Sequence, residues 1–176
     1  MFVKTGDIPG SEAGGQINMP KVVMTCGKLC SGKTTYAKKL QKESKAVILS
    51  VDEIMLALFG QDAGEKHDDY VAGIKEYLYH KSLEIINSGI DVILDWGFWT
   101  KEERACARSF FGSNGITNEF HFIDIDDSEW RRRIEKRNQS VLAHKSDAYY
   151  VDEGLAAKFD SVFERPDPSE IDYRVK

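Results

Sequence analysis

Short apolar runs alternate with longer segments of helical periodicity along most of the chain. The runs, together with one alternating stretch, predict five strands, at 22–26, 45–50, 91–95, 119–124 and 171–175. Apolar residues at helical spacing predict helices at about 34–43, 54–59, 70–87, 101–111, 128–138 and 152–163. The polar stretches 61–69 and 139–150 predict loops. Strands that alternate with helices indicate an α/β domain with a mainly parallel sheet.

The first predicted strand runs directly into a loop that contains glycine. Residues 27–34 read Gly-Lys-Leu-Cys-Ser-Gly-Lys-Thr and fit the phosphate-loop pattern G-x-x-x-x-G-K-[ST]. Backbone N–H groups of such a loop, and the dipole of the helix that follows, attract phosphate. Lys33 would reach the β- and γ-phosphates, and Thr34 would ligate Mg²⁺. The predicted nucleotide-binding residues are Gly27, Lys28, Leu29, Cys30, Ser31, Gly32, Lys33, Thr34 and Thr35.

Two aspartates stand where predicted strands end. Right-handed crossovers bring the carboxyl ends of parallel strands to one edge, where such sheets bind ligands, so both are expected near the loop. Asp95 closes an apolar strand and suits the Mg²⁺ shell, with a solvated or helix-capping role as the alternative. Asp52 follows the second strand and could accept the proton of a hydroxyl that attacks the γ-phosphate. The alternative for Asp52 is capping the next helix.

The predicted helix at 128–138 is strongly basic. Arg133 and Arg137 are four residues apart and share one face of it. Such charge usually covers a solvated helix surface, but arginines on a mobile segment can also neutralise the charge that develops on a migrating phosphoryl group. The aperiodic segment after Asn138 suits a closing lid, so we predict a lid at about 131–150. Arg137 and Arg133 are therefore assigned a catalytic role facing the phosphates.

Other groups near the predicted strand ends admit two interpretations. The rings of Trp96-Gly97-Phe98-Trp99 suit either the core or the wall of a substrate pocket. The aspartates after the fourth strand are interpreted as a solvated turn and a helix cap; they are Asp124, Asp126 and Asp127. The acidic loop 61–69 is interpreted as solvated, although it could meet a cationic substrate. The four histidines lack ligand spacing, so we predict no metal site made of protein side chains alone.

Composition narrows these possibilities only slightly. The chain has 176 residues, 41% hydrophobic and 30% charged, which indicates a single globular domain. A net charge of −5 argues mildly against a protein that coats nucleic acid, and no apolar run is long enough to span a membrane. Three cysteines, two of them at the phosphate loop, favour reduced thiols and a cytoplasmic location over a disulfide framework. Residues 1–19 are rich in glycine and predict a flexible leader.

The chain resembles the small P-loop kinases grouped as predicted ATP-binding kinases. Relatives of that group include polynucleotide 5′-hydroxyl kinase, chloramphenicol phosphotransferase and the zeta-toxin kinases. The likeness covers about residues 20–176 and rests on 27–34, 50–52, 94–99, 135–138 and 163–166. It implies a P-loop NTPase three-layer sandwich, with a five-stranded parallel sheet in the order 2-3-1-4-5 and a helical lid. It also implies ATP and Mg²⁺ as cofactors, Asp52 as general base and Arg137 as a lid residue that contacts phosphate.

Departures from the polynucleotide kinase pattern bear on the acceptor. Glu53 follows Asp52, and Met55 stands where that kinase has an arginine, so a nucleic acid 5′-end is a less attractive acceptor. We therefore expect a kinase that transfers the γ-phosphoryl group of ATP to a hydroxyl of a small molecule. Two alternatives stay open: a polynucleotide 5′-hydroxyl kinase, and an ATP-binding switch or regulatory module that acts on a partner. The sequence does not identify the acceptor or the oligomeric state.

Overall fold

The computed structural model describes residues 19–146 and 148–176. The predicted leader, apart from Met19, lies outside the described residues. The strands are β1 (Lys21–Cys26), β2 (Val47–Ser50), β3 (Val92–Asp95), β4 (Thr117–Ile123) and β5 (Tyr173–Val175). The α-helices are α1 (Lys33–Ser44), α2 (Val51–Phe59), α3 (His67–Asn87), α4 (Lys101–Ser113), α5 (Asp127–Leu142) and α6 (Glu153–Val162). Two 3₁₀-helices, η1 (Gly64–Lys66) and η2 (Pro168–Glu170), precede α3 and β5.

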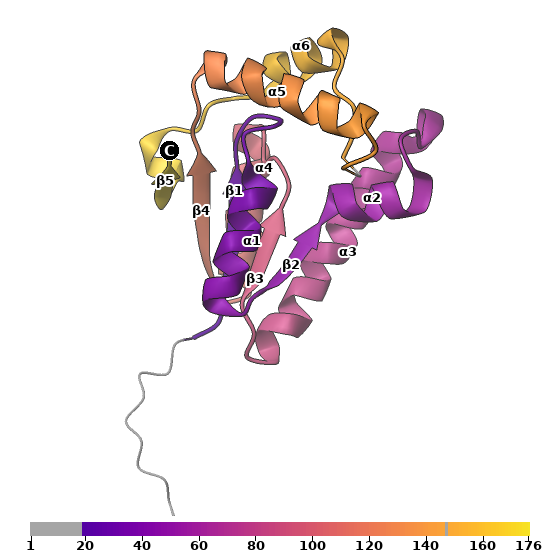
Figure 1. Ribbon diagram of the computed structural model, residues 1–176. Helices are drawn as coiled ribbons and strands as arrows, with labels where there is room; N and C mark the ends of the chain where they lie inside the picture. The colour runs from indigo at the N-terminus through magenta and orange to yellow at the C-terminus, as the bar shows by residue number, and fades with distance from the viewer. Residues whose placement is uncertain (1–18, 147) are drawn as a thin grey trace, which may run out of the picture.

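The five strands form one parallel sheet in the order β2-β3-β1-β4-β5. The expected α/β class and strand order are confirmed. Each crossover returns the chain to the same end of the sheet, so all strands finish at one edge. Figure 1 shows α5 lying across this edge, above the loop between β1 and α1, with α6 close behind it.

Helices cover both faces of the sheet and form two cores of unequal size. On one face, α1 packs alone, through Ala37 and Leu40, against Val23, Ile48 and Ile93. On the other face, α2, α3 and α4 bury a larger cluster that includes Met55, Leu78, Phe111, Met24, Leu94 and Phe120. The strands between them are apolar on both sides, as expected for a parallel sheet covered by helices. This three-layer arrangement fixes the strand ends on which the site is built.

Several predicted boundaries shift for local physical reasons. Part of the predicted loop 61–69 is helical, because η1 leads directly into α3 at His67 and not at 70. Asp68 and Asp69 then lie in the first turn of α3, where carboxylates complement the helix dipole. Helix α5 continues to Leu142, four residues beyond its predicted end. Among the described residues, no helix combines the length and apolar character needed to cross a membrane.

Candidate active site

The loop between β1 and α1 requires glycine at two positions. A Cβ atom at Gly27 would lie 2.8 Å from both the carbonyl oxygen of Ile123 and Ser31 Oγ. Gly32 has a φ of +99°, in the left-handed region, and a Cβ there would lie 2.7 Å from Nη1 of Arg133. The loop can therefore wind tightly before α1 begins, which leaves the first backbone N–H groups of the helix at the carboxyl edge of the sheet.

Lys33 is the first residue of α1, and its side chain folds back over the loop. The Nζ atom donates hydrogen bonds to the carbonyl oxygens of Gly27 (3.1 Å) and Lys28 (2.8 Å). Burial lowers the pKa of Lys33 below its ordinary value of 10.5, while the charges of Asp95 and Asp52 oppose this shift. The loop thus holds a cation that faces two carboxylates.

Asp95 lies at the end of β3, level with Ser50 on β2. Its side chain is buried, and burial raises its pKa above 3.8, while the nearby Thr34 hydroxyl and the charge of Lys33 act in the opposite direction. One carboxylate oxygen lies 3.4 Å from the Thr25 hydroxyl, but the other, Oδ2, is buried without a hydrogen-bond partner among the described residues. A buried carboxylate oxygen without a partner, beside a threonine hydroxyl, fits the oxygen shell that Mg²⁺ requires.

Asp52 lies in the first turn of α2 but does not cap the helix. Ser50 is the N-cap, since its hydroxyl accepts a hydrogen bond from the backbone N–H of Glu53 (3.3 Å). The capping alternative for Asp52 is therefore wrong. The Asp52 side chain is exposed, and its charge acts on Lys33, Asp95 and Tyr149, which places it at the same edge as the loop. No hydrogen bond to this carboxylate occurs within the described part of the chain.

One face of α5 contacts the phosphate loop. Trp130 Nε1 donates to the carbonyl oxygen of Leu29 (2.7 Å), Arg133 Nη1 donates to that of Ser31, and Arg137 Nη1 lies 3.2 Å from Cys30 Sγ. The interpretation of this face as merely solvated is therefore wrong. These residues are three and four apart, so successive turns of α5 lie along the loop.

The side chain of Lys28 points away from the loop, toward α5 and α6, whereas the side chain of Lys33 folds back over the loop. The Lys28 ammonium pairs with Asp127 (2.9 Å) on α5 and Asp160 (2.7 Å) on α6, and lies 4.6 Å from the centre of the Trp130 ring. This predicted nucleotide-binding residue thus joins the loop to the helices above it. Thr35, also predicted, is exposed on the first turn of α1.

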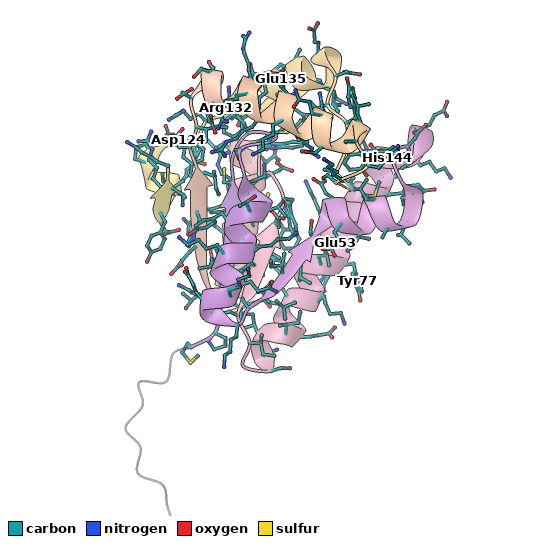
Figure 2. The ribbon with its side chains drawn as sticks, viewed as in Figure 1. Glu53, Tyr77, Asp124, Arg132, Glu135 and His144 are labelled. Carbon is teal, nitrogen blue, oxygen red and sulfur yellow. The ribbon has the colours of Figure 1, made fainter. Side chains whose placement is uncertain are left out.

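The three aspartates after β4 have different surroundings. Asp126 caps α5 by accepting a hydrogen bond from the backbone N–H of Glu129 (2.8 Å), as predicted. Asp124 is not solvated: its largely buried carboxylate pairs with Arg165 (2.8 Å) and Arg174. The sequence interpretation is therefore wrong for Asp124. Figure 2 shows Asp124 beyond the end of β4 and Glu53 on α2, on opposite sides of the edge that carries the loop.

The aromatic segment after Asp95 divides between the two interpretations. Trp96 and Phe98 are buried in the larger core, with ring centroids 5.1 Å apart. Trp99 is half-buried and packs against Phe159 of α6, at 4.4 Å between ring centroids. Core packing therefore accounts for the first two rings but leaves Trp99 at the edge of the core.

Sequence reasoning missed Arg104, which holds this segment in place. Arg104 is 2% exposed, and its guanidinium donates to the carbonyl oxygens of Phe98 (3.1 Å), Trp99 (3.2 Å) and Glu164 (3.0 Å). It also forms a bidentate pair with Glu170 (2.9 and 3.2 Å). Its position on the apolar face of a predicted helix, four residues after the Thr100 cap, was the available signal.

Similarity to known proteins agrees with this geometry. The profile of a family described as an AAA domain, AAA_33, matches residues 22–166. Among curated proteins, no sequence matches significantly. The structure of the Mycobacterium tuberculosis APS kinase CysC in complex with AMPPNP and APS is 22% identical, with 89% of this chain and 88% of that chain covered and a TM-score of 0.64.

Two further solved structures share the fold. A gluconokinase from Sinorhizobium meliloti 1021 is 14% identical, covering 89% of this chain and 82% of its own, with a TM-score of 0.58. A chain of the Pnkp1/Rnl/Hen1 RNA repair complex is 17% identical, covering 87% of this chain and 46% of its own, with a TM-score of 0.66. The chain therefore belongs to the AAA_33 family of AAA domains and has the fold of the small P-loop kinases.

Proposed function

We propose that the protein is an ATP-dependent kinase that phosphorylates a hydroxyl group of a small molecule. The observation that carries this proposal is the exposed carboxylate of Asp52, which Ser50 releases from capping α2 and which follows β2 at the same sheet edge as Asp95. A purely nucleotide-binding module needs a phosphate loop and a metal, but it has no use for a carboxylate base at this position.

The residues would divide the reaction between them as follows. Loop N–H groups and Lys33 bind the β- and γ-phosphates, once Lys33 exchanges the carbonyl oxygens of Gly27 and Lys28 for phosphate oxygens. Thr34 and Asp95 would hold Mg²⁺, which when bound supplies positive charge beside the phosphates. Arg137 and Arg133 approach from α5 and neutralise charge on the moving phosphoryl group.

Asp52 would act on the acceptor. The acceptor oxygen attacks the γ-phosphorus, the bond from that phosphorus to the β–γ bridging oxygen breaks, and ADP leaves. The proton of the acceptor hydroxyl passes to a carboxylate oxygen of Asp52 as the new P–O bond forms. ATP and an alcohol thus give ADP, a phosphate monoester and one proton.

The proposal is tested by phosphoryl transfer from Mg-ATP to a panel of sugars, nucleosides, aminoglycosides and 5′-hydroxyl oligonucleotides. Once an acceptor is found, we expect Asp52→Asn to lower kcat by about 10²- to 10⁴-fold, because general-base catalysis is lost while the shape is kept. Glu53→Gln is the matched control, since Glu53 is the exposed neighbour on the same turn. An Asp52→Asn enzyme that works at the wild-type rate contradicts the assigned base.

The same panel separates the alternatives. Met55 stands at the position where the polynucleotide kinase has an arginine. It is apolar and 1% exposed in the core, so this position has no cation that could contact a nucleic acid. Transfer confined to oligonucleotides would nevertheless favour the polynucleotide kinase. Slow ATP hydrolysis, with no acceptor phosphorylated and a partner affinity that changes with nucleotide, would favour a switch.

A further inference from the structure

The ammonium group of Lys28 joins three elements of the structure. Its Nζ lies 2.9 Å from a carboxylate oxygen of Asp127, the first residue of α5, and 2.7 Å from one of Asp160 on α6. It also lies 4.6 Å from the centre of the Trp130 ring, within the range of a cation–π interaction. The phosphate loop and two helices from the later part of the chain therefore meet at one cation.

The two lysines of the phosphate loop have different kinds of partner. Lys33 donates to two uncharged carbonyl oxygens, and no ion pair to it occurs among the described residues, so its charge can act on phosphate. Lys28 pairs with two carboxylates, whose combined charge exceeds its own. An anion that approached Lys28 would have to displace one carboxylate and would be repelled by the other. Phosphate binding therefore suits Lys33 and not Lys28.

Lys28 lies beside the contacts that dock α5 on the loop. Trp130, whose ring borders the ammonium, donates its indole N–H to the carbonyl oxygen of Leu29 (2.7 Å). About two turns further along the same helix, Arg137 Nη1 lies 3.2 Å from Cys30 Sγ. Because a helix moves as a rigid element, a shift of its first turns also displaces Arg137 from the loop.

Asp160 extends this attachment to α6. Its neighbour Phe159 packs against Trp99, with ring centroids 4.4 Å apart, so adjacent residues of α6 contact the phosphate loop and the segment after β3. The side chain of Asp160 is 48% exposed and that of Asp127 is 76% exposed. Water screens exposed ion pairs and makes them weak. The pair with Asp160 should therefore contribute more than the pair with Asp127.

We propose that Lys28 is a positioning residue that holds α5 and α6 on the phosphate loop and thereby fixes Arg137 beside the phosphates. Lys28 then acts on the reaction through Arg137 and does not bind the nucleotide itself. This inference rests on the proposed kinase function, in which Arg137 neutralises charge on the moving phosphoryl group. It gives a role to a loop position that the phosphate-loop pattern leaves unspecified.

The first test measures nucleotide binding by calorimetry, with no need for turnover. With Mg²⁺ and AMP-PNP, we expect the Kd of Lys28→Met to stay within about twofold of the wild type, while that of Lys33→Met rises at least about tenfold. A rise in Lys28→Met as large as that in Lys33→Met would make Lys28 a nucleotide ligand and overturn the proposal. Unchanged binding in Lys33→Met would instead count against the proposed function, whatever the result for Lys28.

The second test observes the docking of α5 through the indole N–H of Trp130, which the hydrogen bond to Leu29 protects from exchange with water. Trp130→Phe identifies its resonance in a ¹H–¹⁵N spectrum. The backbone N–H of Leu94, in a strand with neighbours on both sides, reports unfolding of the whole domain. Local release of α5 is therefore distinguished from a general loss of stability.

The indole N–H should exchange about tenfold faster in Lys28→Met and about threefold faster in Asp160→Asn, with a smaller change at Leu94. Glu153→Gln, which neutralises an exposed carboxylate on the same helix as Asp160, is the matched control and should leave the indole exchange unchanged. Equal acceleration at the indole and at Leu94, or no acceleration at either, overturns the proposal.

The third test uses the acceptor found by the transfer panel. Lys28→Met should lower kcat about tenfold, counted per nucleotide-binding protein from the calorimetric stoichiometry, while the KM of ATP stays within about twofold. Lys28→Arg keeps a cation that can pair with both carboxylates, so it should restore most of the lost kcat. An unchanged kcat in Lys28→Met, or a Lys28→Arg protein as slow as Lys28→Met, contradicts the positioning role.

Discussion

At the scale of single residues, the site combines charges that oppose one another at short range. Burial makes the charged form of Asp95 unfavourable and raises its pKa, while Thr34 and Lys33 act against this. Burial also lowers the pKa of Lys33, against the charges of the two aspartates. Such a site costs stability without its ligand, because in the proposed function the nucleotide phosphates and Mg²⁺ would complete the charge balance.

Asp95→Asn should therefore make the ligand-free protein more stable at neutral pH. The folded-state pKa of Asp95 is raised, so between its unfolded value of 3.8 and that raised value the folded state binds more protons than the unfolded chain. The destabilising effect of the carboxylate thus grows as the pH rises through the folded pKa and disappears below about pH 4. Urea unfolding of both proteins from pH 4 to pH 8 measures the difference.

The same substitution should weaken the binding of Mg²⁺ at the proposed metal site. We expect the Mg²⁺ concentration for half-maximal turnover to rise about 10- to 100-fold in Asp95→Asn, the range for residues that orient a metal shell. A variant that is both less stable at neutral pH and unaltered in its Mg²⁺ dependence contradicts both assignments.

Residue types at the strand ends predicted most residues of this candidate site. They did not show which of two neighbouring residues caps the helix that follows β2. The sequence Ser50-Val51-Asp52-Glu53 contains two possible caps, two residues apart, and Ser50 is the one that occupies the N-cap. The S-x-x-E spacing of the capping box was the available signal for Ser50. Arg104 was missed for another reason: its burial depends on carbonyl oxygens of Phe98, Trp99 and Glu164, a tertiary arrangement that periodicity does not contain.

At the scale of elements, α5 is the helix that links the phosphate loop to the rest of the edge. Spacing alone placed Arg133 and Arg137 on one face of this helix. It could not show that Arg133 donates to the carbonyl oxygen of Ser31, or that Lys28 crosses to Asp160 on α6. Those contacts depend on how the helix crosses the sheet edge, which only the packed structure determines.

Two side-chain amides, those of Asn138 and Gln61, hold the chain that follows α5. Each amide both donates a hydrogen bond to the backbone of this segment and accepts one from it. Asn138 donates to the carbonyl oxygen of Val151 (2.7 Å) and accepts from its N–H (2.9 Å). Gln61, just after α2, donates to the carbonyl oxygen of Ala148 (3.1 Å) and accepts from the N–H of Tyr150 (3.2 Å). Asn138 and Gln61 are thus two anchors for the chain at 148–151. The predicted lid segment is therefore attached to the helix that carries Asp52.

Removing the two anchors should have unequal effects. Asn138→Ala leaves both polar backbone groups of the buried Val151 unpaired, so we expect a loss of about 1–3 kcal/mol in the free energy of unfolding. Gln61→Ala frees groups that water can reach and should cost about 0.5 kcal/mol or less. Urea unfolding gives the free energies, and hydrogen exchange at the Val151 N–H gives the local change. Gln139→Ala, on the exposed neighbour of Asn138, is the control, and equal losses for Asn138 and Gln61 would contradict the argument.

At the scale of the whole molecule, the order of the strands places the phosphate loop between its partners. Because β1 is central, its loop has β3 and Asp95 on one side and β4 and α5 on the other. Alternating strands and helices predicted the parallel sheet, but the strand order came from family resemblance. Periodicity describes which residues are buried and does not say which strands are neighbours. Figure 1 shows α5 lying above the phosphate loop, across the sheet edge.

A ligand bound at the centre of this sheet edge should stabilise the entire fold. At a concentration 100 times its Kd, Mg²⁺-AMP-PNP should add about 2.7 kcal/mol to the free energy of unfolding, which raises the Tm by about 5–10 °C for a domain of this size. We expect Lys33→Met to lose most of this shift, because it removes the cation that we propose binds the β- and γ-phosphates. Lys38→Met, on the exposed side of α1, is the matched control and should keep it. Differential scanning calorimetry measures all three proteins, and an undiminished shift in Lys33→Met would show that the nucleotide binds elsewhere.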